Sequence, residues 1–457
     1  MTAPVLVFAT LGRRSTALLA LLVLGAPPTA AATELAAPAT TNVLLIVADD
    51  VGIDKIRCYG FPTAPPTPTL DTLALHGVRF ENAWANPACS ATRAAMLTGR
   101  YGFRTGVGYV QGADCPALKL SETTLPELLA TSATFTGPTA LIGKWHNGTA
   151  GVGELLAPNQ AGFDHFSGIL GNLDAESYVD WSKVENGVAS SATNYITTDQ
   201  VDEALAWIGQ QSPGWFCQLS LSAAHAPFMA PPPHLHTQQL PAPTPHGDAL
   251  PFYDATVQAL DTELGRLLTT LAPATLQQTL VIFCGDNGTP PEGVQPPLDP
   301  SKAKLTLYEP GIRVPLIVAG GPVVQPNRVV PHVAHVIDLY ATIANVLAPG
   351  TATQPSGVDS VSLLPYLSSP AAGAQRAYVY SEGFKFNGTV AWGWKQALRN
   401  ARYKLIRSID TATDEFYDLG SDPLEQNDLL AGGALSAAEQ RQYRKLAASL
   451  GMLVANP

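Results

Sequence analysis

The sequence predicts an α/β protein in which a large, mixed and mostly parallel sheet is sandwiched by helices. A smaller C-terminal α+β domain with a short antiparallel sheet is expected to follow. Two observations support this prediction. Four short apolar runs each stop abruptly at polar residues, and amphipathic stretches with apolar residues three to four positions apart lie between them. Continuous apolar runs are typical of strands buried on both faces of a parallel sheet.

The four runs are NVLLIVADD (42–50), which ends at Asp49 and Asp50; TALIGKWHNG (139–148), with Lys144 and His146; WFCQLSLSAAHAP (215–227), with His225; and TLVIFCGDNGT (279–289), with Asp286 and Asn287. Open α/β sheets bind ligands outside the carboxyl ends of their strands. We therefore expect these carboxylate, amide, ammonium and imidazole groups to meet at one edge of the sheet, a pattern that core packing does not require.

Helical periodicity and turn-forming residues complete the predicted order of elements. Helices are expected within 67–80, 120–132, 197–211 and 253–272. The proline-rich stretch 226–248 predicts a long loop beside His225, and 362–376 a hinge. Strand-like runs and a final helix follow the hinge. The predicted organisation is a signal peptide over 1–32, a large domain over 40–365 that carries the four apolar runs, and a smaller C-terminal domain over 366–457.

Charge and the N-terminus indicate where the protein works. The net charge of -11 argues against nucleic acid or an anionic membrane as a partner. Arg13 and Arg14 precede the apolar run 17–26 and a stretch of small residues, which is the pattern of a signal peptide. An uncleaved anchor is the alternative, although the run is short for a bilayer. We expect export to the periplasm or the medium, with no membrane span in the mature chain.

The cysteine count fits an exported protein with one unusual thiol. The chain has five cysteines, an odd number, whereas thiols in oxidising compartments tend to pair. If Cys89 is consumed chemically, the remaining four allow three disulfide connectivities. Those four are Cys58, Cys115, Cys217 and Cys284.

Acidic and amide groups at two strand ends predict a metal site. Asp49, Asp50, Asp286 and Asn287 offer hard oxygen ligands and no sulfur, which suits Ca²⁺ or Mg²⁺ better than Zn²⁺. Either motif alone is more simply a helix cap or a turn, because Asp and Asn dominate both. Their joint occurrence at the ends of buried strands favours a divalent cation.

The segment CSATRAAMLTG (89–99) predicts a helix that begins at Cys89 and stops at Gly99. Unpaired backbone N–H groups at a helix N-terminus favour an anion. Arg93 lies one turn further on the same face. A nucleophile here could meet a sulfate or phosphate group, although an isolated cysteine of this kind is more simply a buried structural residue.

A family resemblance resolves this choice. CSATRAAMLTGRYG (89–102) closely resembles the signature of the type I sulfatases of the alkaline-phosphatase-like superfamily, arylsulfatases among them. In that signature a Cys is followed by any residue, Pro or Ala, any residue, Arg, and an apolar stretch ending in LTG. Further resemblances follow in the family's order: NVLLIVADDVG (42–52), IGKWHNG (142–148), GFDHFSG (162–168), AAHAPF (223–228), FCGDNGT (283–289), KLTLYEPGIRVPLIV (304–318) and FYDLGSDPLEQNDL (416–429).

The resemblance implies a role for each matched residue. Cys89 would be converted to Cα-formylglycine by a maturase, and its hydrate would supply the nucleophilic hydroxyl. A second hydroxyl would then release sulfate and restore the aldehyde. The family's metal ligands correspond to Asp49, Asp50, Cys89, Asp286 and Asn287, and Ca²⁺ is favoured over Mg²⁺. The other implied roles are stabilisation of the ionised hydrate by Arg93, sulfate binding by Lys144 and Lys304, a base in His146 and an acid in His225.

The implied activity is hydrolysis of sulfate monoesters, of an aryl or carbohydrate alcohol, to alcohol and inorganic sulfate. Ala91 stands where many relatives have Pro, which bears on how well a maturase converts Cys89. Phe228 and Pro310 also depart from the commoner His and Gly. Two alternatives stay open: a phosphonate monoester or phosphodiester hydrolase of the same superfamily, and a non-catalytic secreted binding protein on the same scaffold.

Overall fold

The computed structural model describes residues 42–148, 153–173, 177–242, 248–351 and 354–455. They belong to one compact unit that spans 38–457. The predicted signal peptide lies outside the described residues. Among the described helices, none has an apolar stretch long enough to cross a bilayer.

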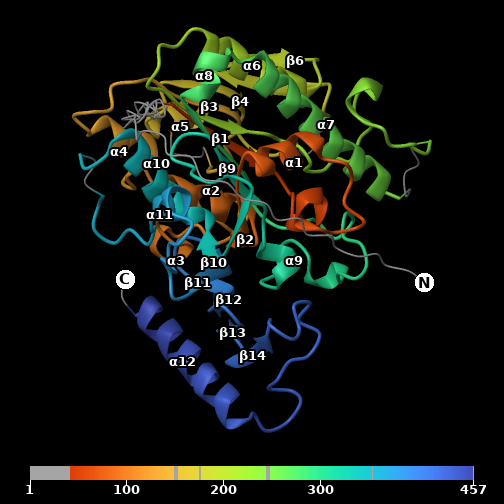
Figure 1. Ribbon diagram of the computed structural model, residues 1–457, viewed down its shortest axis with the longest axis vertical. Helices are drawn as coiled ribbons and strands as arrows, with labels where there is room; N and C mark the ends of the chain where they lie inside the picture. The colour runs from red at the N-terminus through yellow and green to blue at the C-terminus, as the bar shows by residue number, and fades with distance from the viewer. Residues whose placement is uncertain (1–41, 149–152, 174–176, 243–247, 352–353, 456–457) are drawn as a thin grey trace, which may run out of the picture. The chain divides into compact units, whose positions relative to one another are not determined.

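The described strands form a large mixed sheet of ten strands and a second sheet of four (Figure 1). The large sheet contains, in spatial order, β10 (Arg328–His335), β2 (Gly77–Trp84), β9 (Leu316–Ala319), β8 (Thr279–Gly285), β1 (Asn42–Ala48), β7 (Phe216–Ser220), β3 (Thr139–Lys144), β4 (His165–Ile169), β5 (Trp181–Glu185) and β6 (Val188–Ala192). The predicted fold class is therefore confirmed.

The four apolar runs of the sequence are adjacent, parallel strands. In the order β8-β1-β7-β3, every neighbouring pair is parallel. Alternate residues of β1 enter different cores: Val43, Leu45 and Val47 join one cluster, and Leu44 and Ile46 join the other. Burial on both faces explains why these strands have no polar alternation.

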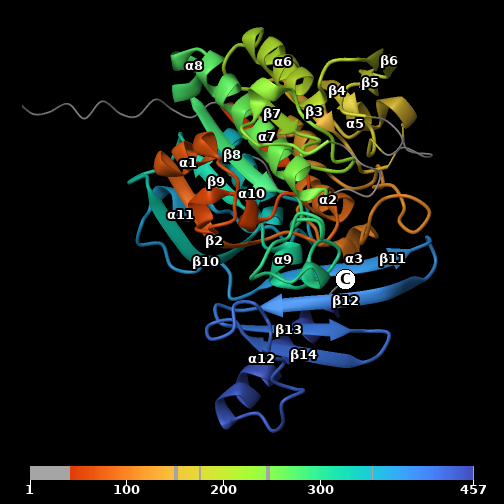
Figure 2. The same cartoon turned by 90° about the vertical axis from the view of Figure 1, so that its right-hand side faces the viewer.

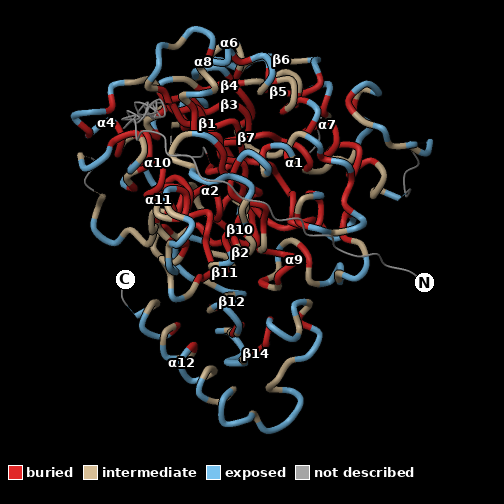
Figure 3. The backbone as a smooth tube through the Cα atoms, in the orientation of Figure 1, coloured by how far each residue is buried: buried red, intermediate tan, exposed pale blue. Residues whose placement is uncertain are grey.

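Helices cover both faces of the large sheet. One cluster contains apolar side chains of α2 (Cys89–Thr98), α4 (Leu125–Ala130), α5 (Ala157–Gln160), α10 (Leu339–Leu347) and α11 (Leu364–Ser368). The other contains those of α1 (Pro68–Leu75), α6 (Ile196–Gly209), α7 (Leu250–Thr270) and α8 (Pro273–Gln277). Figure 3 shows the buried strands between these layers, with exposed residues gathered on the outer turns and loops.

The small sheet has the order β11-β12-β13-β14 and is antiparallel throughout. Its strands are β11 (Val379–Phe386), β12 (Ala391–Arg399), β13 (Tyr403–Ser408) and β14 (Thr413–Asp418). One apolar cluster joins it to α12 (Ala437–Val454) and to α2, and another joins it to α9 (Glu309–Ile312). Figure 2 shows α9 and α3 (Gly102–Thr105) next to β11 and β12.

Two of the predicted helices are too long: the one expected within 120–132 covers only α4, and the one expected within 67–80 covers only α1. The helix expected over 67–80 ends at Leu75, and β2 begins at Gly77. Gly77 lies so close to β9 that a Cβ there would stand 2.3 Å from the carbonyl oxygen of Val318. Pairing of β2 with β9 and β10 therefore outweighs the local helical pattern.

The expected disulfides are wrong. All five cysteines, each within the described residues, are free thiols. Cys217 on β7 pairs in register with Leu44, whereas Cys284 on β8 pairs with Val47, so β1 separates the two cysteines. Their side chains also belong to different cores on opposite faces of the sheet. The sheet thus buries these two cysteines as small apolar residues.

Candidate active site

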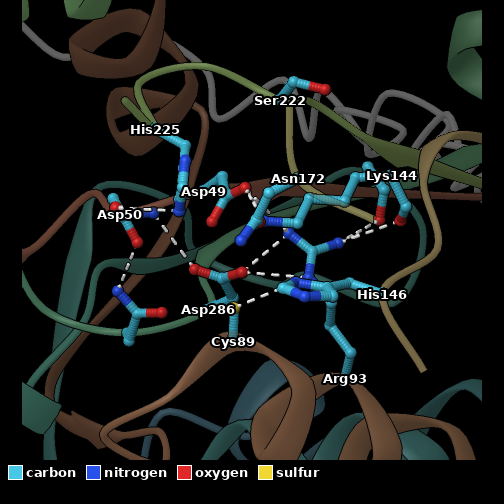
Figure 4. A network of polar contacts seen from close by, with 12 residues as sticks. Asp49, Asp50, Cys89, Arg93, Lys144, His146, Asn172, Ser222, His225 and Asp286 are labelled. Carbon is cyan, nitrogen blue, oxygen red and sulfur yellow. Dashed lines mark hydrogen bonds and ion pairs between the residues drawn. The ribbon is translucent and has the colours of Figure 1, made fainter. Parts of the chain in front are cut away.

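The predicted site residues lie at the carboxyl edge of the parallel block. Asp49 and Asp50 follow β1, Asp286 follows β8, and Lys144 is the last residue of β3. His225 lies in the loop after β7. The structure thus brings together groups that are separated by more than two hundred residues in the sequence, and Figure 4 shows them converging above the start of α2.

The acidic residues are buried and tightly connected. Asp50 donates its backbone N–H to Asp286 Oδ1 at 3.1 Å and accepts a hydrogen bond from Asn287 Nδ2 at 2.8 Å. Its backbone carbonyl accepts a hydrogen bond from Tyr253 at 2.7 Å. Asp50 has a φ of 61°, in the left-handed region that side chains rarely adopt. These contacts hold the strained backbone in place and aim the carboxylate.

Cys89 begins α2, as predicted, and is fully buried. Its sulfur lies 3.2 Å from His146 Nδ1. Burial raises the pKa of the Cys89 thiol, although Lys144 and Lys304 oppose this effect. An unmodified Cys89 is therefore a neutral thiol and a weak nucleophile, because the thiolate is the reactive form.

Arg93 lies one turn along α2, with 1% of its surface exposed. Its Nε and one terminal nitrogen donate to Asp286 Oδ2 at 3.0 and 2.7 Å. The other terminal nitrogen donates to the Lys144 carbonyl at 3.1 Å and to Ser220 Oγ at 3.0 Å. Arg93 therefore ties α2 to the carboxyl ends of β3, β7 and β8 and neutralises a buried carboxylate.

Two lysines pair with different carboxylates of the site. Lys144 Nζ donates to Asp49 and, at 2.6 Å, to Asn172 Oδ1. Lys304 Nζ lies 2.6 Å from Asp50 Oδ1. Sequence reasoning missed Asn172, which follows β4 in a loop with no periodic pattern. It lines the small cavity of the site together with Lys144, His225 and Ser222.

The two predicted catalytic histidines differ in orientation. His146 faces Cys89 and has a φ of 50°. His225 Nδ1 lies 2.8 Å from the Ala226 carbonyl oxygen, and its Nε2 lies 3.8 Å from Asp50 Oδ2. Burial and the Lys144 charge lower the pKa of both histidines. Both therefore favour the neutral form, with His225 Nδ1 as the donor to the carbonyl.

The pKa values of Asp286 and Asp49 shift in opposite directions. Burial raises the pKa of Asp286, and the charge of Asp49 raises it further, against the two hydrogen bonds from Arg93. Burial acts in the same direction on Asp49, but the charges of Lys144, Arg93 and Lys304 outweigh it and lower its pKa. Carboxylates this close do not all ionise easily unless positive charge is added.

The residues present fit a divalent cation. Ligand atoms of Asp49, Cys89 and Asp286 lie within 4.8 Å of one another. Within the described residues, Asp49 Oδ1 and Asn287 Oδ1 are buried without a hydrogen-bond partner. Orphaned buried oxygens are costly, and a hard cation would satisfy them. Asp50 could complete the set.

The remaining histidines lie outside this network. His335 is buried beside α10, whereas His246 falls outside the described residues. The others are His76, His165, His234, His236 and His332, none of which contributes to the groups of potential ligands found among the described residues.

Comparison with protein families gives two matches. The family model described as Sulfatase matches residues 41–349. A model described as N-sulphoglucosamine sulphohydrolase, C-terminal, matches residues 303–450. Together they extend over both sheets of the structure.

Curated relatives agree with these matches. The chain is 30% identical to N-acetylgalactosamine-6-sulfatase of Homo sapiens over 407 residues, which cover 80% of this chain and 74% of that protein. It is 27% identical to arylsulfatase A of Homo sapiens, with 92% and 90% of the two chains covered.

Solved structures share the fold. A protein solved in complex with its substrate D-glucosamine-2-N,6-O-disulfate superposes with a TM-score of 0.74 at 22% identity, covering 91% of this chain and 98% of the other. A sulfatase from Pseudoalteromonas has a TM-score of 0.67 at 22% identity, with 92% of each chain covered.

Proposed function

Because this chain belongs to the sulfatase family, whose members hydrolyse sulfuric esters, we propose that it is an exported enzyme that uses formylglycine at position 89 and a divalent cation to cleave sulfate monoesters of sugars or aryl alcohols. The single observation that supports this most is the position of Cys89. It is fully buried at the start of α2, and its sulfur and one carboxylate oxygen each of Asp49 and Asp286 all lie within 4.8 Å of one another.

The proposed modification accounts for a thiol that is poorly suited to act by itself. Formylglycine, as its hydrate, would supply one hydroxyl to attack sulfur with release of the alcohol, and a second hydroxyl whose deprotonation breaks the C–O bond to sulfate and restores the aldehyde. His146, 3.2 Å from the Cys89 sulfur, is placed to take a proton from the residue at position 89. Its lowered pKa keeps it neutral and available as a base.

The lysines and Arg93 provide the positive charge around the reacting group. Lys144 and Lys304 would exchange part of their contact with Asp49 and Asp50 for sulfate oxygens, since ammonium groups can bridge two anions. Charge preorganised in a buried site stabilises a transition state more than the same charge in water. Asn172, bonded to Lys144, would fix the direction of that ammonium group.

His225 is proposed to serve the leaving alcohol. Its Nδ1 is held by the Ala226 carbonyl, which leaves Nε2 to exchange a proton on the cavity side. The neutral form is favoured in the free protein, and a bound sulfate ester would favour the protonated form by adding negative charge nearby.

The proposed cation would be held by Asp49, Asp50, Asp286, Asn287 and the residue at position 89. When bound, it supplies Lewis acidity and lowers the pKa of the attacking hydroxyl. The all-oxygen ligand set favours Ca²⁺ over Mg²⁺, since Ca²⁺ accepts more ligands in less regular geometry.

Mass spectrometry of the peptide that contains position 89, from the native host, tests the proposal. We expect an aldehyde in place of the thiol, and loss of 4-nitrophenyl sulfate hydrolysis in Cys89→Ala. An unmodified thiol in fully active enzyme would contradict the mechanism. Ala91 makes the modified fraction a useful second readout, because conversion depends on an external maturase.

Turnover of phenylphosphonate esters, compared with that of 4-nitrophenyl sulfate, distinguishes a sulfatase from a phosphonate monoester or phosphodiester hydrolase. We expect 4-nitrophenyl sulfate to give the higher kcat/KM. The names of the relatives, N-acetylgalactosamine-6-sulfatase and arylsulfatase A, support a sulfated sugar or aryl group as the alcohol half. A higher kcat/KM for the phosphonate ester would contradict sulfate ester hydrolysis as the main reaction. Activity on neither ester would indicate a binding protein.

A further inference from the structure

A second pocket lies where the segments that carry Cys89 and Lys304 meet, and we call it the side groove. It has a volume of about 300 Å³, and its walls include Pro87, Tyr109, Leu305, Tyr308, Phe384 and Lys395. The walls thus come from four places: the segment before α2, the loop after α3 that carries Tyr109, the segment before α9, and the strands of the small sheet. Figure 2 shows β11 and β12 running past α9 at this position.

The side groove begins where the catalytic residues end. Pro87 precedes Cys89 by two residues, and Leu305 directly follows Lys304. The Leu305 backbone N–H donates to the Pro87 carbonyl at 3.0 Å, so the segments that carry the nucleophile and the sulfate-binding lysine meet at the groove wall. The alcohol half of a sulfate ester bound at these segments would therefore lie close to the groove.

The part of the wall that carries Tyr109 and Phe384 is fixed to α2 by hydrogen bonds. Gln111 donates its backbone N–H to Ser90 Oγ at 3.0 Å, which fixes the loop that carries Tyr109 to the first turn of α2. Phe384 donates its backbone N–H to the Gly108 carbonyl at 3.0 Å. A Cβ at Gly108 would stand 2.3 Å from the Phe384 ring, so this contact requires glycine. The groove is thus preorganised, which favours a specific ligand.

The chemistry of the walls suits a ring with an anionic substituent. Tyr109, Tyr308 and Phe384 offer aromatic surface, and Leu305 keeps 46% of its surface exposed. Aromatic faces and exposed apolar side chains bind the C–H faces of sugar or aryl rings by burying apolar surface. Such a wall beside a charged centre matches a substrate whose sulfate is joined to a ring.

The charged groups of the groove leave one cation without a partner. Lys385 pairs with Asp114 at 2.8 Å, and Glu415 accepts hydrogen bonds from Tyr308 and Tyr417 at 2.7 and 2.6 Å. Lys395 is exposed, and in the described part of the chain no side chain forms an ion pair or hydrogen bond with it. It is the cation that stays available to a ligand.

We propose that the side groove binds the alcohol half of the substrate, and that this half is a saccharide whose ring next to the sulfated unit carries a second anionic group facing Lys395. This inference rests on the proposed sulfatase activity and adds a substrate class to it. A larger cavity of about 670 Å³ between α1 and α7 is lined by apolar and small polar residues and His76, with no lysine, arginine or carboxylate, and is not built for such a ligand.

The test compares two forms of each probe. Sulfated disaccharides are prepared with a carboxylate on the unsulfated ring, or with that carboxylate reduced to an alcohol, and released sulfate is measured by ion chromatography. We expect Lys395→Gln to raise KM about fivefold for the carboxylate form, with unchanged kcat. KM for the reduced form and for 4-nitrophenyl sulfate should not change, and Lys395→Arg should restore the wild-type KM.

Lys445→Gln is the matched control, since it removes the same charge from an exposed position on α12. Equal effects of Lys395→Gln on both forms of the disaccharide, or none on either, overturn the inference. So does a wild-type enzyme that hydrolyses 4-nitrophenyl sulfate but no disaccharide of either form. Absence of sulfate release from every probe, 4-nitrophenyl sulfate included, overturns the sulfatase proposal itself, so the two failures are distinguishable.

Discussion

Replacing Lys404 by Met should destabilise the protein strongly, although Lys404 contacts none of the predicted site residues. Lys404 lies on β13 with no exposed surface. Its Nζ is 2.7 Å from Glu425 Oε1 and 3.3 Å from Glu309 Oε1, and it lies over the Trp84 ring at 4.8 Å from the centroid. Methionine keeps most of the length and apolar surface of the side chain, so the substitution removes mainly the charge.

The expected loss of unfolding free energy follows from the buried carboxylate that loses its cation. Glu309 keeps an ion pair with Arg399 at 2.8 Å, whereas Glu425, also fully buried, forms its only ion pair within the described residues with Lys404. Burial already raises the pKa of Glu425, and the Glu309 charge adds to the effect. Removing one partner of a buried pair costs about 3–5 kcal/mol. We expect the lower end, about 3 kcal/mol, because only one carboxylate is left uncompensated.

Differential scanning calorimetry gives the readout. A unit of roughly 420 residues has an unfolding entropy of about 0.9 kcal/mol/K, so Tm should fall by about 3 °C. Neutralising the carboxylate in Lys404→Met/Glu425→Gln should recover at least half of that loss. A single variant that costs less than about 1 kcal/mol, or a double variant less stable than the single one, would refute the assignment of a buried, uncompensated charge.

Three further outcomes are expected. Dialysis against EGTA should lower both activity and Tm, and Ca²⁺ should restore both, because bound metal stabilises the folded state; a Tm that does not respond would count against the metal site. Asn172→Ala should raise KM for 4-nitrophenyl sulfate about tenfold with little change in Tm, since Asn172 positions Lys144 from a partly exposed loop; an unchanged KM would remove it from the site. Burial and Arg376 lower the pKa of His335 to about 3, below about 6.5 in the unfolded chain. The unfolded state therefore binds the proton first, and stability should fall as pH drops from about 6.5 toward 3, by about 2–3 kcal/mol at pH 4.5. In His335→Asn, which keeps an acceptor for the Ile337 N–H, unfolding free energy measured by urea titration should depend less steeply on pH than in the wild type.

The parallel block of the fold could be predicted because its physical cause is local. A strand buried on both faces must be apolar along its whole length, so β1, β3, β7 and β8 are visible as uninterrupted runs. The polar residues that follow each run mark the point where the chain leaves the core. Their meeting at one edge then follows from parallel pairing alone.

Features that depend on tertiary pairing could not be predicted. Gly77 starts a strand because β9 passes within contact of its backbone, and nothing in the local pattern near α1 indicates this. The cysteine count suggested pairing, but Cys217 and Cys284 face opposite cores. Asn172 became a candidate only through its 2.6 Å contact with Lys144, which no sequence spacing implies.

The acidic and basic side chains of the site balance one another in charge. Three carboxylates, Asp49, Asp50 and Asp286, are paired with Arg93, Lys144 and Lys304, so the side chains alone are close to neutral.

The whole chain carries a net charge of -11, and its long-range field repels an anionic substrate. In the proposed enzyme, the added charge of a divalent cation would turn this balanced cluster into a positively charged pocket. Attraction of the sulfate ester would then depend on the bound ion, and the lysines could leave their carboxylate partners without exposing uncompensated negative charge. The same carboxylates that neutralise the lysines would thus hold the ion that releases those lysines for the substrate.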